Sequence, residues 1–514
     1  MPVRRRDASV GGRAWYRSIG EMFESAELGH RVDKGDYERE LPKLRAALLD
    51  AQMRVLERGE FGVVVVIGGV DGSGKGDVVN LLLEWTDARH IRVHATGEPT
   101  DEERARPPMW RFWRALPPKG QTGIFFGAWH TAPIVDRVYG RIGSAELTRS
   151  LVEIARFERM LVDEGALVIK LWLHMTKGAQ RSRFEQLEAS AATAWRVNKQ
   201  DWKNHARYDR FRKVTEHALR ETSTAEAPWT VVEATDAHYR NLTVGRSLVE
   251  AVNQRLDQGK RTPVVRAAPP PPPAIDARNV LKELDLTKSL SDRQYDKKLP
   301  MLQARLNALS RQKRFGDTAV VLVFEGNDAA GKGGTIRRVT RALDARRYEV
   351  VPVAAPTEEE RAQPYLWRFW RHVPRVGHVT LFDRSWYGRV LVERVEGLAA
   401  PPDWMRAYRE IVDFEQSLVR FGIVVVKFWL AISKEEQLAR FRSREKTPFK
   451  RYKITGEDWR NRKKWDAYEQ AVSDMVDRTS TDLAPWRLVE ANDKKWARVE
   501  VLQTICTSIE EAMG

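Results

Sequence analysis

Apolar and polar positions follow two different periods in the C-terminal half of this chain. Leu299, Leu302, Leu306 and Leu309 recur at helical spacing and predict an amphipathic helix. The run at 320–324 is apolar throughout and precedes a glycine-rich loop, which predicts a strand buried in a parallel sheet. Further strands are expected at 349–353, 379–382, 423–430 and 487–489, and helices at 403–421 and 434–444.

Strands that alternate with helices are typical of an α/β fold, in which helices cover both faces of a parallel sheet. Ligands bind such sheets beyond the carboxyl ends of the strands. The glycine-rich loop stands at the end of the first predicted strand. The pattern therefore predicts an α/β domain whose ligand site includes this loop.

The chain contains an internal repeat. The stretch VVVVIGGVDGSGK, which ends at Lys75, returns as VVLVFEGNDAAGK, which ends at Lys332. The stretch PTDEERARPPMWRFWR returns as PTEEERAQPYLWRFWR, and both pairs are 257 positions apart. A period this long indicates duplicated domains rather than a solenoid of short repeats.

The repeated loop has the spacing of a phosphate-binding P-loop. Gly326, Gly331 and Lys332 fit G-x-x-x-x-G-K between a predicted strand and a predicted helix. The glycines let backbone N–H groups and the helix N-terminus face an anion, and Lys332 would reach the transferring phosphates. The Ser or Thr that normally follows and binds Mg²⁺ is absent, because Gly333 and Gly334 stand there.

Three charged residues complete the predicted catalytic set. Asp328 lies inside the loop, where a carboxylate would repel phosphate unless it holds a metal ion or faces an acceptor; a turn-forming aspartate is the alternative. Asp383 follows the third strand, and an acidic residue at that place is the usual Mg²⁺ partner of a P-loop. Arg384 beside it would clamp phosphate oxygens, unless the two form only a surface pair.

A basic run crosses the end of the helix expected at 434–444 and the loop after it. In P-loop kinases such a segment is a lid that closes over phosphates and excludes water, whereas a solvated basic face is the alternative. The run WRFWR at 367–371 is compatible with base stacking, phosphate binding or core packing. The cations of the basic run are Arg440, Arg442, Arg444, Lys446, Lys450, Arg451 and Lys453.

Five consecutive prolines at 269–273 mark the boundary between the two copies, since such a run favours an extended, semi-rigid spacer. A chain of 514 residues is also too long for one ordinary core. We expect a degenerate P-loop kinase-like domain at 1–258, a Pro-rich linker at 259–275 and a catalytic P-loop kinase domain at 276–514. Each domain is expected to have a parallel sheet flanked by helices, with a lid.

The N-terminal copy keeps the loop but loses the chemistry around it. Asp71 and Lys75 are retained, whereas Phe-Gly-Ala at 126–128 replaces the Asp-Arg-Ser that begins at Asp383. A domain that loses these groups and keeps its core has lost catalysis, and scaffolding, dimerisation or anion binding are the roles left to it. The further replacements are Leu187 for Arg444, Ala189 for Lys446, Thr193 for Lys450, Ala194 for Arg451, Thr235 for Asn492 and Ala237 for Lys494.

The net charge and the amino-acid composition limit the classes of binding partner that can be expected. The net charge of +16 and the pI near 9.8 favour a polyanion: nucleic acid, an anionic membrane or a phosphate-rich substrate. No apolar run approaches the ~18 residues of a membrane span, and no apolar stretch follows the basic N-terminus as in a signal peptide. Cys506 is the only cysteine, which excludes an intrachain disulfide and a cysteine-based zinc cluster. A cytoplasmic protein is expected.

These motifs resemble polyphosphate kinase family 2, whose P-loop carries the same aspartate and the same glycine after the lysine. The resemblance rests on GNDAAGKGG at 326–334, FDRSWYGR at 382–389 and PFKRYK at 448–453, with APW and NDK further on. It extends over both copies and nearly the whole chain. One lid position departs from the family, because Tyr452 stands where a tryptophan is usual.

The tandem form resembles the fused class of that family, which transfers the terminal phosphate of polyphosphate to AMP and gives ADP. The resemblance implies a catalytic C-terminal copy, with Mg²⁺ as cofactor held by Asp328 and Asp383, and with Arg389 and Glu393 at the nucleotide. The implied phosphate-binding residues are Gly326, Gly331, Gly333, Gly334, Arg444, Lys446, Lys450, Arg451 and Lys453.

The expected partners are polyphosphate and a nucleoside mono- or diphosphate. Neither nucleic acid nor a membrane is required, and a homo-oligomer stays open. Three alternatives also stay open at this point: polyphosphate-dependent phosphorylation of ADP or GDP, a conventional ATP-using nucleoside monophosphate kinase, and a non-catalytic protein that binds polyanions.

Overall fold

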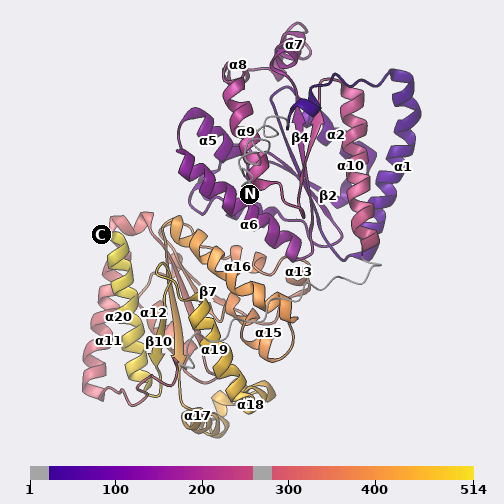
Figure 1. Ribbon diagram of the computed structural model, residues 1–514. Coiled ribbons are helices and arrows are strands. Elements are labelled where there is room, and N and C mark those ends of the chain that lie inside the picture. Colours follow the sequence, from indigo (N-terminus) through magenta and orange to yellow (C-terminus); the bar gives the residue numbers. More distant parts are fainter. Residues whose placement is uncertain (1–21, 259–279) are drawn as a thin grey trace, which may run out of the picture. The chain divides into compact units, whose positions relative to one another are not determined.

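The computed structural model describes residues 22–258 and 280–514, which fold around two separate β-sheets (Figure 1). The linker expected at 259–275 lies outside the described residues. Each sheet has five strands, and every strand pair is parallel. The prediction of two α/β domains is therefore confirmed. The part built on the first sheet is called the first unit here, and the other the second unit.

The second unit has the strand order β10-β9-β6-β8-β7, with the P-loop strand β6 in the centre. All five strands coincide with the runs predicted from the sequence, with ends that shift by at most two residues. The strands are β6 (Ala319–Gly326), β7 (Tyr348–Pro352), β8 (Val379–Asp383), β9 (Ile423–Ala431) and β10 (Trp486–Glu490).

The register of these strands gathers polar residues at one edge. Phe324 of β6 pairs with Asp383 of β8, and Gly326 pairs with Leu430 of β9. Because the strands are parallel, their carboxyl ends meet at the same side of the sheet, beyond which ligands bind. The P-loop and the loop after β8 consequently start next to each other.

Helices cover both faces of the second sheet (Figure 1). One face packs against α11, α12 and α20, and its core includes Leu302, Phe324, Ile336 and Ile505. Helices α16 and α19 pack together on the other face, against β9. The helices between residues 280 and 514 are α11 (Asp292–Ser310), α12 (Lys332–Thr340), α13 (Glu358–Arg361), α14 (Trp367–Trp370), α15 (Val392–Val395), α16 (Pro401–Arg420), α17 (Lys434–Lys446), α18 (Gly456–Lys463), α19 (Trp465–Thr479) and α20 (Lys494–Met513).

The aromatic run WRFWR belongs to the core. Trp367, Phe369 and Trp370 of α14 are all buried, and Trp370 makes an edge contact with Phe414 of α16. Of the three interpretations that the sequence left open, core packing is confirmed for these three rings.

The first unit repeats this architecture with the strand order β2-β3-β1-β4-β5. Its strands are β1 (Val63–Gly69), β2 (Ile91–Ala95), β3 (Thr122–Phe126), β4 (Leu167–His174) and β5 (Trp229–Glu233). The helices between residues 22 and 258 are α1 (Lys34–Arg58), α2 (Lys75–Trp85), α3 (Asp101–Arg104), α4 (Trp110–Ala115), α5 (Thr131–Tyr139), α6 (Ser144–Asp163), α7 (Lys177–Glu188), α8 (Lys199–His205), α9 (Tyr208–Thr222) and α10 (Ala237–Gln258). No helix within 22–258 or 280–514 has the length and apolar character that a membrane span needs.

A buried ion pair joins sheet and helix in each unit. Lys427 of β9 donates to Glu415 of α16 at 2.7 Å and to the Thr479 carbonyl at 2.8 Å, and both charged side chains are almost fully buried. Lys170 and Glu158 form the same pair in the first unit at 2.6 Å. Burial lowers the pKa of Lys427 and raises that of Glu415, and the attraction between them opposes both shifts.

We predict that Lys427→Met lowers the stability of the second unit by about 3–5 kcal/mol, because Glu415 is then left buried without its cation. Urea unfolding followed by tryptophan fluorescence measures this loss. Lys170→Met is the matched control, which lowers the stability of the first unit instead and so assigns the two transitions.

The double variant Lys427→Met with Glu415→Leu should recover part of the lost stability, since an apolar pair can replace a buried ion pair. Unchanged unfolding of Lys427→Met would contradict the importance of this pair.

Candidate functional site

The loop between β6 and α12 depends on glycine at both ends. Gly326 has φ 148°, and a Cβ atom there would lie 2.5 Å from the Leu430 carbonyl oxygen. Gly331, before the first residue of α12, has φ 113°. Ala329 and Arg384 are the non-glycine residues with positive φ in the described part of the chain, at 64° and 65°. Such torsions cost energy and cluster at functional sites, and both residues belong to the predicted site region.

Lys332 begins α12 and turns back across the loop. Its Nζ donates to the Gly326 carbonyl at 2.7 Å and to the Asn327 carbonyl at 3.4 Å. Burial lowers the pKa of Lys332 and the Arg384 charge adds to this, whereas Asp328 and nearby carboxylates oppose it. The lysine is thus held at the end of β6, beside the helix N-terminus where an anion would bind.

Asp328 is held between two partners. Its Oδ1 lies 3.3 Å from an Arg384 terminal nitrogen, and its Oδ2 accepts a hydrogen bond from Asn461 Nδ2 at 2.9 Å. The backbone carbonyl of Asp328 accepts from Gln437 Nε2 at 3.2 Å. The loop aspartate therefore has specific side-chain partners on other elements, which the alternative of a simple turn residue would not require.

Asp383 is the last residue of β8. Its Oδ2 lies 3.7 Å from the position that a Cβ atom would take at Gly333, in the first turn of α12. Because Gly333 has no side chain, the carboxylate reaches the helix N-terminus beside Lys332. The structure thus brings Asp328, Lys332, Asp383 and Arg384 to one edge of the sheet; their catalytic roles stay predictions.

The two carboxylates fit a magnesium ion but not a metal site built from protein alone. Within the described residues no group of three or more His, Cys, Asp or Glu side chains is placed to hold a metal. Mg²⁺ is usually held by one or two carboxylates together with water and substrate phosphates. Asp328 and Asp383 supply that kind of donor set, which substrate phosphate oxygens would complete.

Glu325 is a site residue that the sequence reasoning missed. It precedes Gly326 at the end of β6, is buried, and accepts a hydrogen bond from Ser385 Oγ at 2.9 Å. Burial raises its pKa, and the charge of Lys332 opposes that shift. The signal was present in the sequence, because Glu325 is a charged residue directly between the apolar run at 320–324 and the loop.

The basic run does not act as a single lid. Arg440 is buried and donates to the carbonyl oxygens of Ala329 and Ala330 at 2.9 Å and of Ala491 at 2.7 Å. The prediction that Arg440 is a lid cation is therefore wrong, because carbonyl groups of the loop and of the segment after β10 already take up its donors. Arg440 instead stabilises the P-loop through hydrogen bonds to its backbone carbonyl groups.

A second set of cations lies near the start of α12. The pKa of Lys494 is lowered first by burial and then by the positive charges of Arg440, Arg498 and Arg444. An Arg498 nitrogen lies 3.5 Å from the position of a Cβ atom at Gly334. Positive charges held close together repel one another unless an anion lies between them. This cluster therefore favours the binding of a polyanion. The sequence reasoning missed Arg498, because the residues around it have the pattern of an ordinary helix.

The remaining predicted phosphate ligands lie further out. Lys446 ends α17, and Arg451 donates to the Glu445 carbonyl at 2.9 Å; both side chains are exposed. The side chains of Lys450 and Lys453 lie outside the described part of the structure. Tyr452, in the same short helix at Pro448–Lys453, is 75% exposed.

The predicted nucleotide residues lie beside the loop site but do not line its pocket. Arg389 Nε is 2.8 Å from Glu393 Oε2, one helical turn away. The pocket itself has a volume of about 90 Å³ and includes Asp328, Lys332 and Arg384. Its aromatic walls, Trp429, Trp465 and Tyr468, were not predicted as site residues.

Comparison with known proteins gives the same assignment to both units. The family model Polyphosphate kinase 2 (PPK2) matches residues 31–260 and 289–513. The chain is 56% identical over 491 residues to the Polyphosphate:AMP phosphotransferase of Pseudomonas aeruginosa, covering 96% of this chain and 99% of the relative. It is also 39% identical over 221 residues to the NDP-polyphosphate phosphotransferase 3 of Ruegeria pomeroyi, covering 43% of this chain and 73% of the relative.

A solved structure from Pseudomonas aeruginosa PA01, described as polyphosphate kinase 2, has 55% sequence identity and a TM-score of 0.87. The alignment covers 96% of this chain and 99% of that one. Two consecutive matches to one family model, and a relative similar from end to end, agree with the duplicated P-loop units described above. The chain belongs to the polyphosphate kinase 2 family.

Proposed function

We propose that the second unit transfers the terminal phosphoryl group of polyphosphate to AMP and releases ADP. One observation carries this assignment: the P-loop, Asp383 and the Asp328–Arg384 pair meet at one sheet edge in this unit. At the positions of Asp383 and Arg384 the first unit has Phe126 and Gly127. A relative named Polyphosphate:AMP phosphotransferase, similar over almost its whole length, supports the same activity.

The charge around the loop suits a polyphosphate donor. Arg498 and Arg444 lie close enough to Lys494 for their charges to help lower its pKa, and the whole chain carries a net charge of +16. Polyphosphate has about one negative charge per phosphate, so successive phosphates would each meet a cation. Lys446 and Arg451, exposed further out, would extend this contact along the polymer.

The chemistry needs positioning and charge stabilisation rather than a strong base. Backbone N–H groups of the loop and Lys332 would hold the terminal phosphate of the donor. An oxygen of the AMP phosphate attacks the phosphorus atom of this terminal donor phosphate in line. The bond to the bridging oxygen breaks, and the shortened polyphosphate leaves with the bonding electron pair. Arg384 would offset the charge that develops on the transferring group.

Mg²⁺ is part of the proposal, with Asp328 and Asp383 as its protein ligands. When bound, it would neutralise phosphate charge and orient donor oxygens. Asp328 is paired with Arg384 in this structure, so a carboxylate that meets the metal also fixes the arginine that meets the phosphoryl group. We further expect the reaction to take place in the cytoplasm.

A second candidate acceptor is a nucleoside diphosphate. The similarity of one unit to an NDP-polyphosphate phosphotransferase favours it. The donor and the loop would be the same, and only the length of the acceptor phosphate chain would differ. The first experiment must therefore identify the product as well as the donor.

We predict that purified protein with Mg²⁺, AMP and long-chain polyphosphate forms ADP without added ATP. Chromatographic analysis of the nucleotides measures the product, and parallel reactions replace AMP with ADP and polyphosphate with ATP. Formation of ATP from ADP would move the enzyme to the diphosphate-using class. Turnover with ATP alone would show that the donor had been assigned wrongly.

Asp383→Asn should lower the rate of ADP formation by about 10²–10³-fold, because the amide keeps the shape of the side chain but not its charge. Initial rates over a range of Mg²⁺ concentrations measure the effect. Asp482→Asn, at an exposed carboxylate outside the pocket, is the control and should keep full activity. Full activity of Asp383→Asn would exclude the metal-ligand role.

A further inference from the structure

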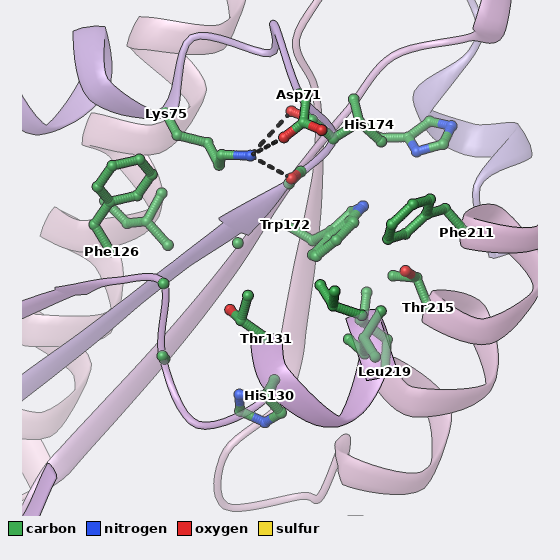
Figure 2. Close-up of a pocket in the computed structure, with 18 of the residues that line it drawn as sticks. Asp71, Lys75, Phe126, His130, Thr131, Trp172, His174, Phe211, Thr215 and Leu219 are labelled. Carbon is green, nitrogen blue, oxygen red and sulfur yellow. Dashed lines mark hydrogen bonds and ion pairs between the residues drawn. The ribbon is translucent and has the colours of Figure 1, made fainter. Parts of the chain in front are cut away.

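The first unit has a much larger cavity than the second at the corresponding edge of its sheet. Its volume is about 530 Å³, against about 90 Å³ for the pocket of the second unit. Figure 2 shows its side chains converging from β3, β4, α5 and α9, with Lys75 and Asp71 of the loop at one end. A volume of this size falls in the range of pockets that enclose a small organic molecule.

Three of four replacements at this edge explain why the space is open. The positions of Glu325, Asp383, Arg384 and Tyr387 in the second unit are occupied in the first by Gly68, Phe126, Gly127 and His130. Two long charged side chains are reduced to hydrogen atoms, and a tyrosine becomes a smaller ring. A Cβ atom at Gly68 would lie 2.8 Å from the ring of Trp172, so the indole occupies the place of the lost carboxylate.

The walls of the cavity are mainly aromatic and aliphatic. Trp172 lies in the middle of the view in Figure 2, with Phe211 on one side and Leu219 below. Phe126 and Trp229 also line the space. Flat apolar walls of this kind favour a planar ring, which gains from stacking and edge contacts as well as from leaving water.

Several buried nitrogen atoms of the lining residues have no hydrogen-bond partner in the described part of the structure. They include Trp172 Nε1, His130 Nδ1 and His174 Nδ1, and all are shielded from solvent. His130 is 4% exposed, and its Nε2 lies 3.0 Å from Glu158 Oε1. Burial lowers the pKa of His130 although Glu158 opposes the shift. Because these atoms are shielded from solvent while the cavity itself is open, they lie behind its surface, and the walls and the loop end select the ligand.

The loop end of the cavity suits one anionic group. Lys75 Nζ donates to the Gly69 carbonyl at 2.6 Å and lies 3.5 Å from Asp71, at the N-terminus of α2. Arg212, also in the wall, lies 3.5 Å from Glu27. The lid cations of the second unit are replaced by Leu187, Ala189, Thr193 and Ala194. A long polyanion is thereby disfavoured, whereas a single phosphate at the helix N-terminus is not.

We infer that the first unit binds a purine nucleoside monophosphate and does not turn it over. The base would pack against Trp172 and Phe211, and the phosphate would meet Lys75 and the N-terminus of α2. Binding would require no divalent metal, because Phe126 stands at the position of Asp383. The site is separate from the proposed catalytic pocket, and its existence does not depend on the donor used there.

Photolabelling of the full chain tests this inference. The probe is 8-azido-AMP in EDTA without polyphosphate, followed by illumination and peptide mapping. Label is expected within residues 22–258 as well as in the second unit. Thr131→Trp should remove it from the first unit, because Thr131 is an exposed residue that lines the cavity. Ala132→Trp, at an exposed neighbour outside the lining, is the matched control and should keep the label.

The anionic end is tested separately by Lys75→Ala. This variant should weaken competition by unlabelled AMP about tenfold and leave competition by adenosine nearly unchanged. Absence of label from residues 22–258 in the wild type would overturn the inference, and so would label that survives Thr131→Trp. Neither result depends on phosphoryl transfer, so this proposal can fail while the catalytic one stands.

Discussion

The position of the predicted catalytic residues depends on one buried carboxylate. Glu415 accepts hydrogen bonds from Trp386 Nε1 at 3.0 Å and from the Tyr387 hydroxyl at 2.7 Å, and it is paired with Lys427. Trp386 and Tyr387 follow Asp383 and Arg384 almost at once in the chain. The carboxylate therefore fixes the loop after β8 to helix α16 and strand β9. With the next residues held in this way, Arg384 can keep its unfavourable left-handed torsion beside Asp328.

The first unit keeps the buried carboxylate and its partners, whereas the residues at the edge of its sheet differ. Glu158 accepts from Trp129 Nε1 at 3.0 Å and is paired with Lys170, as in the second unit. Asn204 donates to Asp71 at 2.8 Å, as Asn461 does to Asp328. The contacts that hold the core and the loop in place are thus equivalent in the two copies. The residues between them differ without loss of the fold, and one copy has a compact charged pocket while the other has a wide aromatic cavity.

Much of this could be predicted from the sequence, because the deciding signals are local. Short runs rich in apolar residues located all five strands of the second sheet, and glycine spacing located the loop that receives Lys332. The contacts that complete the site are not local. Asn461 and Arg498 come from helices far along the chain, and no spacing rule links them to the loop. Arg440 has the sequence context of a surface cation, yet its guanidinium group is buried and donates hydrogen bonds to carbonyl oxygens of two loops. The volume of the first cavity also follows only from how the side chains pack.

The most direct test is the rate at which the full chain forms ADP from AMP and polyphosphate after Lys332→Met. The variant keeps the length of the side chain and removes its charge from the loop of the second unit. The account predicts a loss of at least about 10²-fold, with folding unchanged by circular dichroism. A rate within about twofold of the wild type would contradict it, because phosphoryl transfer would then not depend on the P-loop lysine of the second unit.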